Sequence, residues 1–330
     1  GDFESYDHLE EMVREALQVG EVDTGTADVF ANLDDVLEED FRHPIPMGIP
    51  GIDNLLKGGM AKGELGVILA PTGVGKSTLL TKISNHAFNL GYNVLQIFFE
   101  DNPKIIQRKH FTLWTEIAPD LLSLHKDKVM DKIKDIRENT PNKLILKKLP
   151  SDTLTMNQIK NQIRKMTAEG NKVDMVVLDY IDCVVPDKNL GDEWKSEGSV
   201  MRGFESMCHE LDLVGWTATQ GNRSSISSDV VTTDQMGGSI KKAQVGHVII
   251  SVAKSLQQKE MKLATIAITK SRIGDDGIVF ENCKFDNGML EIDTESSVTF
   301  LGLEDNKEEK NRQRVKELLE KKKLKQKNSQ

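Results

Sequence analysis

The sequence has few cysteines and no long apolar run. Its three cysteines, Cys183, Cys208 and Cys283, show neither CxxC spacing nor pairing with histidine. That scatter argues against a zinc site and favours reduced thiols in a cytosolic setting. Apolar runs such as 175–178 are far shorter than the ~20 residues that cross a bilayer. The first 20 residues are acidic and do not resemble a secretory signal. We therefore expect a cytoplasmic protein with no membrane partner.

Basic residues are outnumbered by acidic ones, and the two kinds are separated along the chain. The 330 residues carry a net charge of −9. Residues 1–42 hold 14 Asp/Glu and two Arg, which gives −12, whereas residues 304–330 carry +4 and residues 43–303 carry −1. The overall acidity argues against a generic nucleic-acid coat, but it leaves room for a local basic channel in the nearly neutral central part.

Composition and pattern divide the chain into three segments. Apolar content of 38% with 29% charged residues is typical of a globular protein. Residues 1–42 predict an acidic arm with a helix over 9–17 and a second short helix over 29–37. The arm either folds back on its own domain or docks on another subunit. Three prolines then mark a boundary before a domain over 43–303, and residues 304–330 predict a basic, partly helical or disordered tail.

Short apolar runs alternate with helical patterns in the central domain. Strands are predicted at 65–70, 93–99, 143–148, 173–179, 214–220, 247–253 and 263–270, and helices at 77–90 and 154–168. Alternation of this kind predicts an α/β fold with a mostly parallel sheet flanked by helices. The last strands follow each other closely, so the far edge of the sheet is expected to be mixed or antiparallel.

A phosphate-binding loop joins the first predicted strand to the first predicted helix. Its residues are Ala70-Pro71-Thr72-Gly73-Val74-Gly75-Lys76-Ser77, followed by Thr78. The glycines let successive backbone N–H groups face phosphates, and the helix adds its positive dipole end. Lys76 is expected to reach the β- and γ-phosphates, and the Ser77 hydroxyl to bind Mg²⁺. The segment predicts a site for ATP or another nucleoside triphosphate.

Polar residues at the ends of three other predicted strands complete a candidate hydrolytic site. Asp179 ends an apolar strand, as a carboxylate ligand of Mg²⁺ would. Glu100 ends another, where it can deprotonate an attacking water. Asp101 competes for that role, and Glu100 is preferred because it directly follows the apolar run. Gln220 ends a third strand and can sense the γ-phosphate and relay its loss to the loop 221–239.

Two basic residues lie at the end of the last predicted strand. Lys270 and Arg272 are separated by one residue, and Gly274 follows. They are either ordinary surface charges or the kind of pair that an arginine finger acting on a neighbouring subunit requires.

These pieces, in this order, resemble the replicative hexameric DNA helicases of the DnaB type (superfamily 4), especially those of tailed phages. The resemblance covers about residues 46–292. Its specific marks are Leu178-Asp179-Tyr180-Ile181, Ala218-Thr219-Gln220-Gly221-Asn222-Arg223 and Thr269-Lys270-Ser271-Arg272-Ile273-Gly274. The resemblance implies a RecA-like P-loop fold, ATP and Mg²⁺, and a homo-hexameric ring that moves 5′→3′ on single-stranded DNA. It also implies a primase, a helicase loader and other replisome proteins as partners.

The resemblance implies a role for each site residue. It assigns Lys76 to phosphate, Ser77 and Asp179 to Mg²⁺, and Glu100 to the base. It further implies Gln220 as the sensor, and Arg272 with Lys270 as cations acting on a neighbour's ATP.

The chain departs from the bacterial pattern in two places. Bacterial members have Asp-Leu-Arg-x-Ser-Gly where this chain has Asp234-Gln235-Met236-Gly237-Gly238-Ser239, so the family's Arg is missing. The primase-engaging N-terminal domain of bacterial members has no counterpart, and we expect either a removed domain or a reduced phage form. Contacts with DNA phosphates are expected from Arg223, Lys241 and Lys242, unless these are ordinary solvated cations.

Two other functions fit the same pattern. Gly237-Gly238 followed by Lys241 is compatible with a RecA-like recombinase that forms filaments and exchanges strands. A P-loop ATPase that serves as a scaffold without moving on DNA is the third reading.

Overall fold

The structure is a computed structural model that describes residues 29–30, 33–37, 41–187, 193–222, 230–233, 236, 240–294 and 298–300. Contacts divide the chain into two units, Gly1–His43 and Pro44–Gln330. In the first unit, helix α2 (Leu33–Val36) falls within the predicted helix 29–37. The predicted helix over 9–17 and the tail 304–330 lie outside the described residues.

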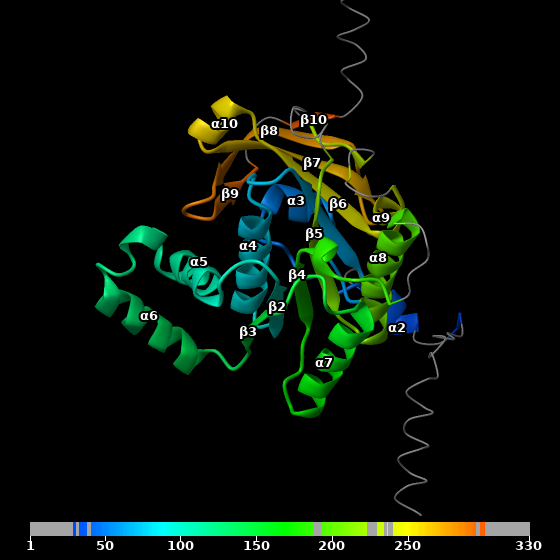
Figure 1. Ribbon diagram of the computed structural model, residues 1–330, viewed down its shortest axis with the longest axis horizontal. Helices are drawn as coiled ribbons and strands as arrows, with labels where there is room; N and C mark the ends of the chain where they lie inside the picture. The colour runs from blue at the N-terminus through cyan, green and yellow to red at the C-terminus, as the bar shows by residue number, and fades with distance from the viewer. Residues whose placement is uncertain are drawn as a thin grey trace, which may run out of the picture. The chain divides into compact units, whose positions relative to one another are not determined.

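The described strands of the second unit form one sheet, which Figure 1 shows with helices on both sides. The order is β10-β8-β7-β6-β1-β5-β4-β2-β3, and β9 pairs with β8. The strands are β1 Leu65–Ala70, β2 Val94–Phe98, β3 Leu144–Lys148, β4 Met175–Asp179, β5 Val214–Gln220, β6 Val248–Ala253, β7 Leu263–Ser271, β8 Ile278–Asp286, β9 Glu291–Asp293 and β10 Val298–Phe300. All seven predicted strands are confirmed.

The two faces of the sheet are buried in separate hydrophobic cores. Strand β1 alternates between them, since Ile68 packs into one core and Val67 and Leu69 into the other. Helices α3 (Pro50–Leu55) and α4 (Lys76–Asn89) contribute to the first core. Helices α7 (Met156–Ala168) and α8 (Glu193–Glu210) contribute to the second. This double cover explains why the central strands are continuous apolar runs.

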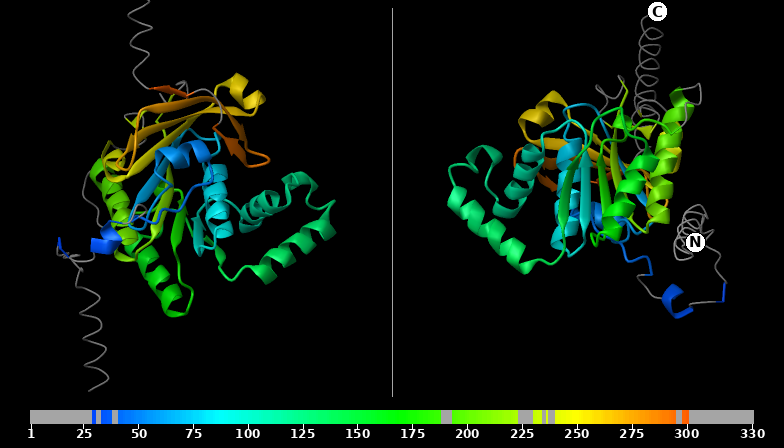
Figure 2. Two further views of the ribbon diagram at one scale, coloured as in Figure 1. Left: turned by 180° about the vertical axis from the view of Figure 1, so that it is seen from behind. Right: turned by 60° about the horizontal axis from the view of Figure 1, so that its bottom comes forward.

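Helices α5 (Pro103–Thr115) and α6 (Lys126–Asn139) were not predicted from the sequence. They lie between β2 and β3 in the chain, and both views of Figure 2 show them projecting to the side of the sheet. The remaining short elements are the 3-10 turns η1 (Pro119–Leu121) and η2 (Ile181–Cys183) and the helices α9 (Ile240–Val245) and α10 (Leu256–Glu260). Among the described residues, no helix combines the length and apolar composition needed to cross a bilayer.

Strand direction gives the sheet two chemically different edges. Strands β3, β2, β4, β5, β1 and β6 are parallel. Their ends, including Asp179 and Gln220, form what we call the carboxyl edge. Strand β7 runs antiparallel to β6, and Ser271 near its end pairs with Val248 at the start of β6. The end of β7 therefore lies at the opposite, amino edge. The six residues of β6 correspond to about 20 Å between the edges.

Candidate active site

The phosphate loop connects β1 to α4 at the carboxyl edge. Gly73 and Gly75 adopt φ values of 78° and 124°, which residues with a Cβ rarely adopt. Gly75 is the N-cap of α4, and no side chain caps this helix end. The first amides of α4 are thus directed at the space where an anion binds favourably.

Lys76 folds back over this loop. Its Nζ donates hydrogen bonds to the carbonyl oxygens of Ala70 (3.1 Å) and Pro71 (3.3 Å). Burial lowers the pKa of Lys76, while the negative charges of Asp179 and Asp182 oppose that shift. The Lys76 ammonium is thus held by two carbonyl oxygens of its own loop, in the electrostatic field of nearby carboxylates.

Asp179 lies next to Ser77, as the magnesium prediction requires. The carboxylate ends β4, is 6% exposed and shares a hydrogen bond with the Ser77 side chain. Burial raises the pKa of Asp179, and the Ser77 hydrogen bond and the charge of Lys109 oppose this rise. A buried carboxylate beside a hydroxyl is an oxygen donor set that suits Mg²⁺.

Glu100 and Asp101 follow β2 but have different partners. Tyr180 Oη donates a hydrogen bond to Glu100 Oε1 at 3.1 Å. Asp101 Oδ2 lies 3.5 Å from Lys109 Nζ, so its charge is already paired. This difference supports Glu100 over Asp101 as the base, because the Asp101 carboxylate is already held by the Lys109 ammonium.

Gln220 contacts the phosphate loop directly. It pairs in register with Ala70 across β1 and β5, and its Nε2 donates to Thr72 Oγ1 at 2.5 Å. An amide in this position can respond to the occupancy of the loop, as the sensor prediction requires.

These groups line a single cavity of about 520 Å³. The predicted residues in its wall are Thr72, Gly73, Gly75, Lys76, Ser77, Thr78, Glu100, Asp179 and Gln220, and the competing candidate Asp101 lines it as well. Pro71 and Val74 were also predicted, but both are buried, and Val74 packs into the core. Lys109, Tyr180 and Asn287 line the cavity without having been predicted.

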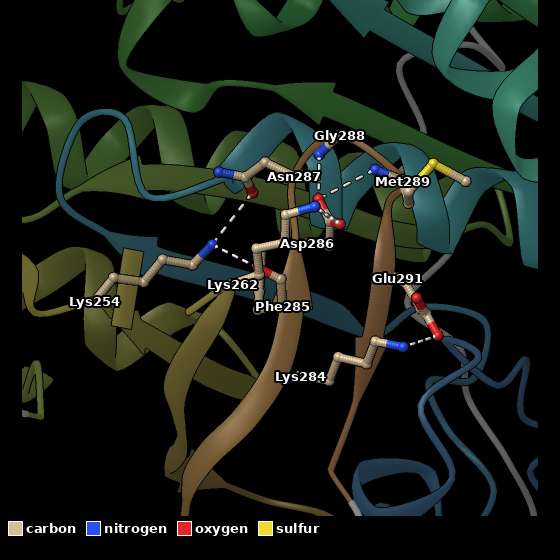
Figure 3. Close-up of polar contacts among 9 residues, drawn as sticks. All are labelled: Lys254, Lys262, Lys284, Phe285, Asp286, Asn287, Gly288, Met289 and Glu291. Atoms are coloured by element: carbon tan, nitrogen blue, oxygen red, sulfur yellow. Dashed lines mark hydrogen bonds and ion pairs between the residues drawn. The ribbon is translucent and has the colours of Figure 1, made fainter. Parts of the chain in front are cut away.

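Asn287 belongs to the turn between β8 and β9, shown with its polar contacts in Figure 3. A Cβ on Gly75 would lie 2.3 Å from Asn287 Oδ1, so this turn packs tightly on the loop. Lys254 Nζ donates to Phe285 O (3.0 Å) and Asn287 Oδ1 (3.4 Å) and lies 4.0 Å from the centre of the Phe285 ring. Burial lowers the pKa of Lys254 to about 8. Two features of the sequence could have pointed to these residues: Lys254 directly follows a predicted strand, and Asn287-Gly288 is a dipeptide typical of turns.

Lys270 and Arg272 lie at the amino edge and do not line the cavity. Lys270 Nζ donates to the carbonyl oxygens of Ala243 (2.7 Å), Gln244 (2.9 Å) and Gly246 (2.6 Å). Arg272 Nη2 donates to Gln244 O at 2.6 Å. Burial lowers the pKa of Lys270 to about 8, and the charge of Arg272 adds to the effect. Within one chain these cations hold the end of α9.

Among the predicted DNA contacts, only Lys242 has a described side chain. It is 3% exposed, and its Nζ pairs with Asp182 and with Glu197 at 3.1 Å. Burial between two carboxylates removes Lys242 from the surface, which argues against its predicted contact with DNA phosphates. Arg223 and the side chain of Lys241 lie outside the described residues.

Known proteins share this fold and part of this sequence. A DnaB-like replicative helicase of Enterobacteria phage T4 is 23% identical over 249 residues, which are 70% of this chain and 50% of that protein. The chain therefore spans about half the length of the curated relative it matches.

Two solved structures match 87% of the chain each. One is a DnaB-like replicative helicase described with its interactions with primase (TM-score 0.67, 16% identity, 72% of that chain). The other is described as an ATPase domain (TM-score 0.65, 15% identity, 98% of that chain). These likenesses confirm the predicted RecA-like α/β fold. Residues 44–293 also match the model of the DnaB-like helicase C terminal domain. Because that match covers most of the chain, the chain belongs to the DnaB-like helicase C-terminal domain family.

Proposed function

We propose that this protein is an ATP-driven replicative DNA helicase that forms a hexameric ring and moves 5′→3′ on single-stranded DNA. The observation that carries the proposal is the meeting of Lys76, Asp179, Glu100 and Gln220 at one cavity. A cavity of about 520 Å³ is large enough for a nucleotide-sized ligand. Membership of the DnaB-like family supports the same activity.

The phosphate loop binds the nucleotide, together with two side chains that provide oxygen ligands for Mg²⁺. The amides of α4 and the Lys76 ammonium hold the phosphates, and a phosphate oxygen replaces the carbonyl contacts of Lys76. Ser77 and Asp179 would hold Mg²⁺, since the Asp179 carboxylate is buried beside the Ser77 hydroxyl. When bound, Mg²⁺ supplies positive charge that offsets the negative charge of the phosphates.

Hydrolysis needs a base and a sensor. Glu100 accepts a proton from the attacking water, and the hydrogen bond from Tyr180 orients its carboxylate. Gln220 stays on Thr72 or turns to the γ-phosphate, depending on the nucleotide state. Its backbone then carries the change into the loop that follows β5.

A neighbouring subunit supplies the remaining cations. Lys270 and Arg272 lie at the amino edge, about 20 Å along β6 from the carboxyl edge of their own chain. Their position supports a role at the neighbour's site and argues against one at their own. In a ring, the acidic arm 1–42 docks on the adjacent subunit.

The partners follow from the same proposal. Single-stranded DNA binds through Arg223 and Lys241, which remain predictions. The solved DnaB-like relative was described with primase, and we propose primase, a helicase loader and other replisome proteins as partners in the cytoplasm, which is that of the host if the protein is phage-encoded.

One set of measurements tests this function. ATP hydrolysis is followed with and without single-stranded DNA, unwinding is measured on forks with a 5′ or a 3′ loading strand, and particles with an ATP analogue are imaged by electron microscopy. Rings that unwind only the 5′-loaded fork are expected. Helical filaments would favour a recombinase, and hydrolysis indifferent to DNA would favour a scaffold. Deletion of residues 1–42 should reduce ring formation in light scattering.

A further inference from the structure

Asp182 lies in η2, three residues after Asp179, and connects strand β5 to the turn that follows β4. Its Oδ2 accepts a hydrogen bond from the backbone N–H of Gln220 at 3.2 Å. Its Oδ1 accepts one from Thr219 Oγ1 at 3.1 Å. Asp182 does not line the nucleotide cavity, so it acts on the end of β5 and not on a ligand. Two bonds to adjacent residues fix the backbone from which the Gln220 side chain reaches Thr72.

The same carboxylate is paired with helix α9. Lys242 Nζ donates to Asp182 Oδ1 and lies 3.1 Å from Glu197 Oε2 on α8. Lys242 is 3% exposed, and the side chains of Asp182 and Glu197 are 23% and 28% exposed. Because Lys242 is almost fully buried, separating it from Asp182 would cost a buried cation one of its two carboxylate partners. Asp182 therefore contacts both the end of β5 at Gln220 and helix α9.

The C-terminal half of α9 is held by the cations of the amino edge. Three donors of Lys270 and one of Arg272 bond to carbonyl oxygens at residues 243–246. Cations at a helix C-terminus are favourable, because the last carbonyls carry partial negative charge. The backbone rises about 6 Å from Lys242 to Gly246, and the long side chains of Lys242 and Lys270 extend this reach. One short helix thus contacts groups from both edges of the sheet.

We propose that Asp182, through its ion pair with Lys242, is the positioning residue that transmits the state of Gln220 to α9 and so to Lys270 and Arg272. The chain's own nucleotide site then sets the position of the cations that serve the neighbour's site. This inference rests on the proposed function, since it uses the sensor role of Gln220 and the interface role of Arg272. It assigns Lys242 to coupling in place of DNA contact.

Hydrogen exchange measured by mass spectrometry on the full chain tests the connection directly. Exchange is compared between a non-hydrolysable ATP analogue and ADP, both with Mg²⁺, in peptides covering 71–78 and 240–246. The wild-type protein should show a difference of about threefold or more at 240–246. In Asp182→Asn that difference should disappear while the difference at 71–78 remains. Lys242→Gln should behave likewise, and Lys242→Arg, which keeps the charge, should preserve the response.

Two results would overturn the proposal. One is a wild-type α9 that does not respond to the nucleotide. The other is an Asp182→Asn variant in which exchange at 240–246 rises equally in both states and the difference persists, because that pattern marks a purely structural ion pair. Lys160→Gln is the matched control: it removes another lysine–carboxylate pair, Lys160 with Glu210 at 2.9 Å, between α7 and α8. It should leave the nucleotide response intact.

Steady-state kinetics separate coupling from DNA contact. Under the proposal, Asp182→Asn and Lys242→Gln both reduce the stimulation of kcat by single-stranded oligothymidine, by about tenfold, with similar KM for ATP. The double variant should be no worse than either single one, because the residues act as a unit. If Lys242 contacts DNA instead, Lys242→Gln weakens oligothymidine binding while Asp182→Asn strengthens it, and the proposal is wrong. Absence of DNA stimulation in the wild type would refute the proposed helicase, whereas the exchange data still decide the role of Asp182.

Discussion

The carboxyl edge and the amino edge of the sheet carry different parts of the candidate machinery. At the carboxyl edge, four strand ends deliver Lys76, Asp179, Glu100 and Gln220 to one cavity. At the amino edge, the side chains of Lys270 and Arg272 donate to carbonyls at the end of α9. The residues at the carboxyl edge form one cavity within a single chain, whereas Lys270 and Arg272 at the amino edge lie far from that cavity.

Strand direction explains this division. Parallel strands end on the same edge, so residues far apart in the sequence converge there. Strand β7 runs in the opposite direction and therefore carries its terminal cations to the other edge. The proposal of a site completed between subunits follows from this reversal. Four experiments can break or sharpen the distinction between the edges.

The largest effect is expected from mixing subunits with lesions at opposite edges. Arg272→Ala alone should lower kcat by about 10³–10⁵-fold if it serves as a finger in trans. When Arg272→Ala subunits are mixed with Glu100→Gln subunits, part of the hydrolysis should return. It should return at interfaces where one subunit keeps Glu100 and its neighbour keeps Arg272. Lys128→Ala, on the exposed surface of α6, is the control partner. Absence of rescue would mean that both residues serve the same chain.

Glu100→Gln and Asp101→Asn compare the two acids of the carboxyl edge. Loss of the base should lower kcat by about 10²–10⁴-fold while ATP binding persists. Asp101→Asn should have a far smaller effect, because Asp101 is paired with Lys109. Single-turnover hydrolysis and binding of a fluorescent ATP analogue measure the two quantities. The reverse ranking would transfer the role to Asp101.

Lys76→Ala tests the phosphate loop. Loss of a charged donor to the phosphates should reduce kcat/KM by about 10²–10³-fold. Circular dichroism should show an unchanged fold, because the contacts of Lys76 are to its own loop. Intact ATPase activity in this variant would remove the phosphate-loop assignment.

The smallest effect is a pH dependence at the amino edge. The pKa of Lys270 is lowered to about 8, so its positive charge is present below that pH and is lost as the pH rises through it. Activity should therefore fall severalfold between about pH 7.5 and 9, and Lys270→Arg should flatten the decline because arginine stays protonated. Profiles of kcat for the two proteins make the comparison. Identical profiles would show that Lys270 does not limit turnover.

Strands and helices with strong apolar patterns were predictable from the sequence. The central strands are buried on both faces and therefore form unbroken apolar runs. In strand β8, the polar residues Glu281, Asn282 and Lys284 interrupt the apolar pattern. Helix α6 has Val129 as its one buried residue. Strand β8 buries six of its nine residues but without regular alternation, and α6 buries too little, so hydrophobic periodicity reveals neither element.

The candidate site shows the same limit. The phosphate loop has a local sequence signature, and Asp179, Glu100 and Gln220 each end an apolar run. Tyr180 and Asn287 also line the cavity, but neither ends an apolar run. Tyr180 lies in the turn after β4, and Asn287 lies in the hairpin between β8 and β9, which is distant in the sequence. Lys242 was predicted to contact DNA phosphates, and its burial could not be read from the sequence because its carboxylate partners, Asp182 and Glu197, come from other parts of the chain.

The sequence by itself determined the phosphate loop, the order of the central strands along the chain and the residues at their ends, because these depend on local pattern. Only the tertiary structure decided which strand ends share an edge, which lysines are buried, and that α9 connects the two edges. Such properties depend on strand direction and on contacts between distant segments, and no local pattern contains them.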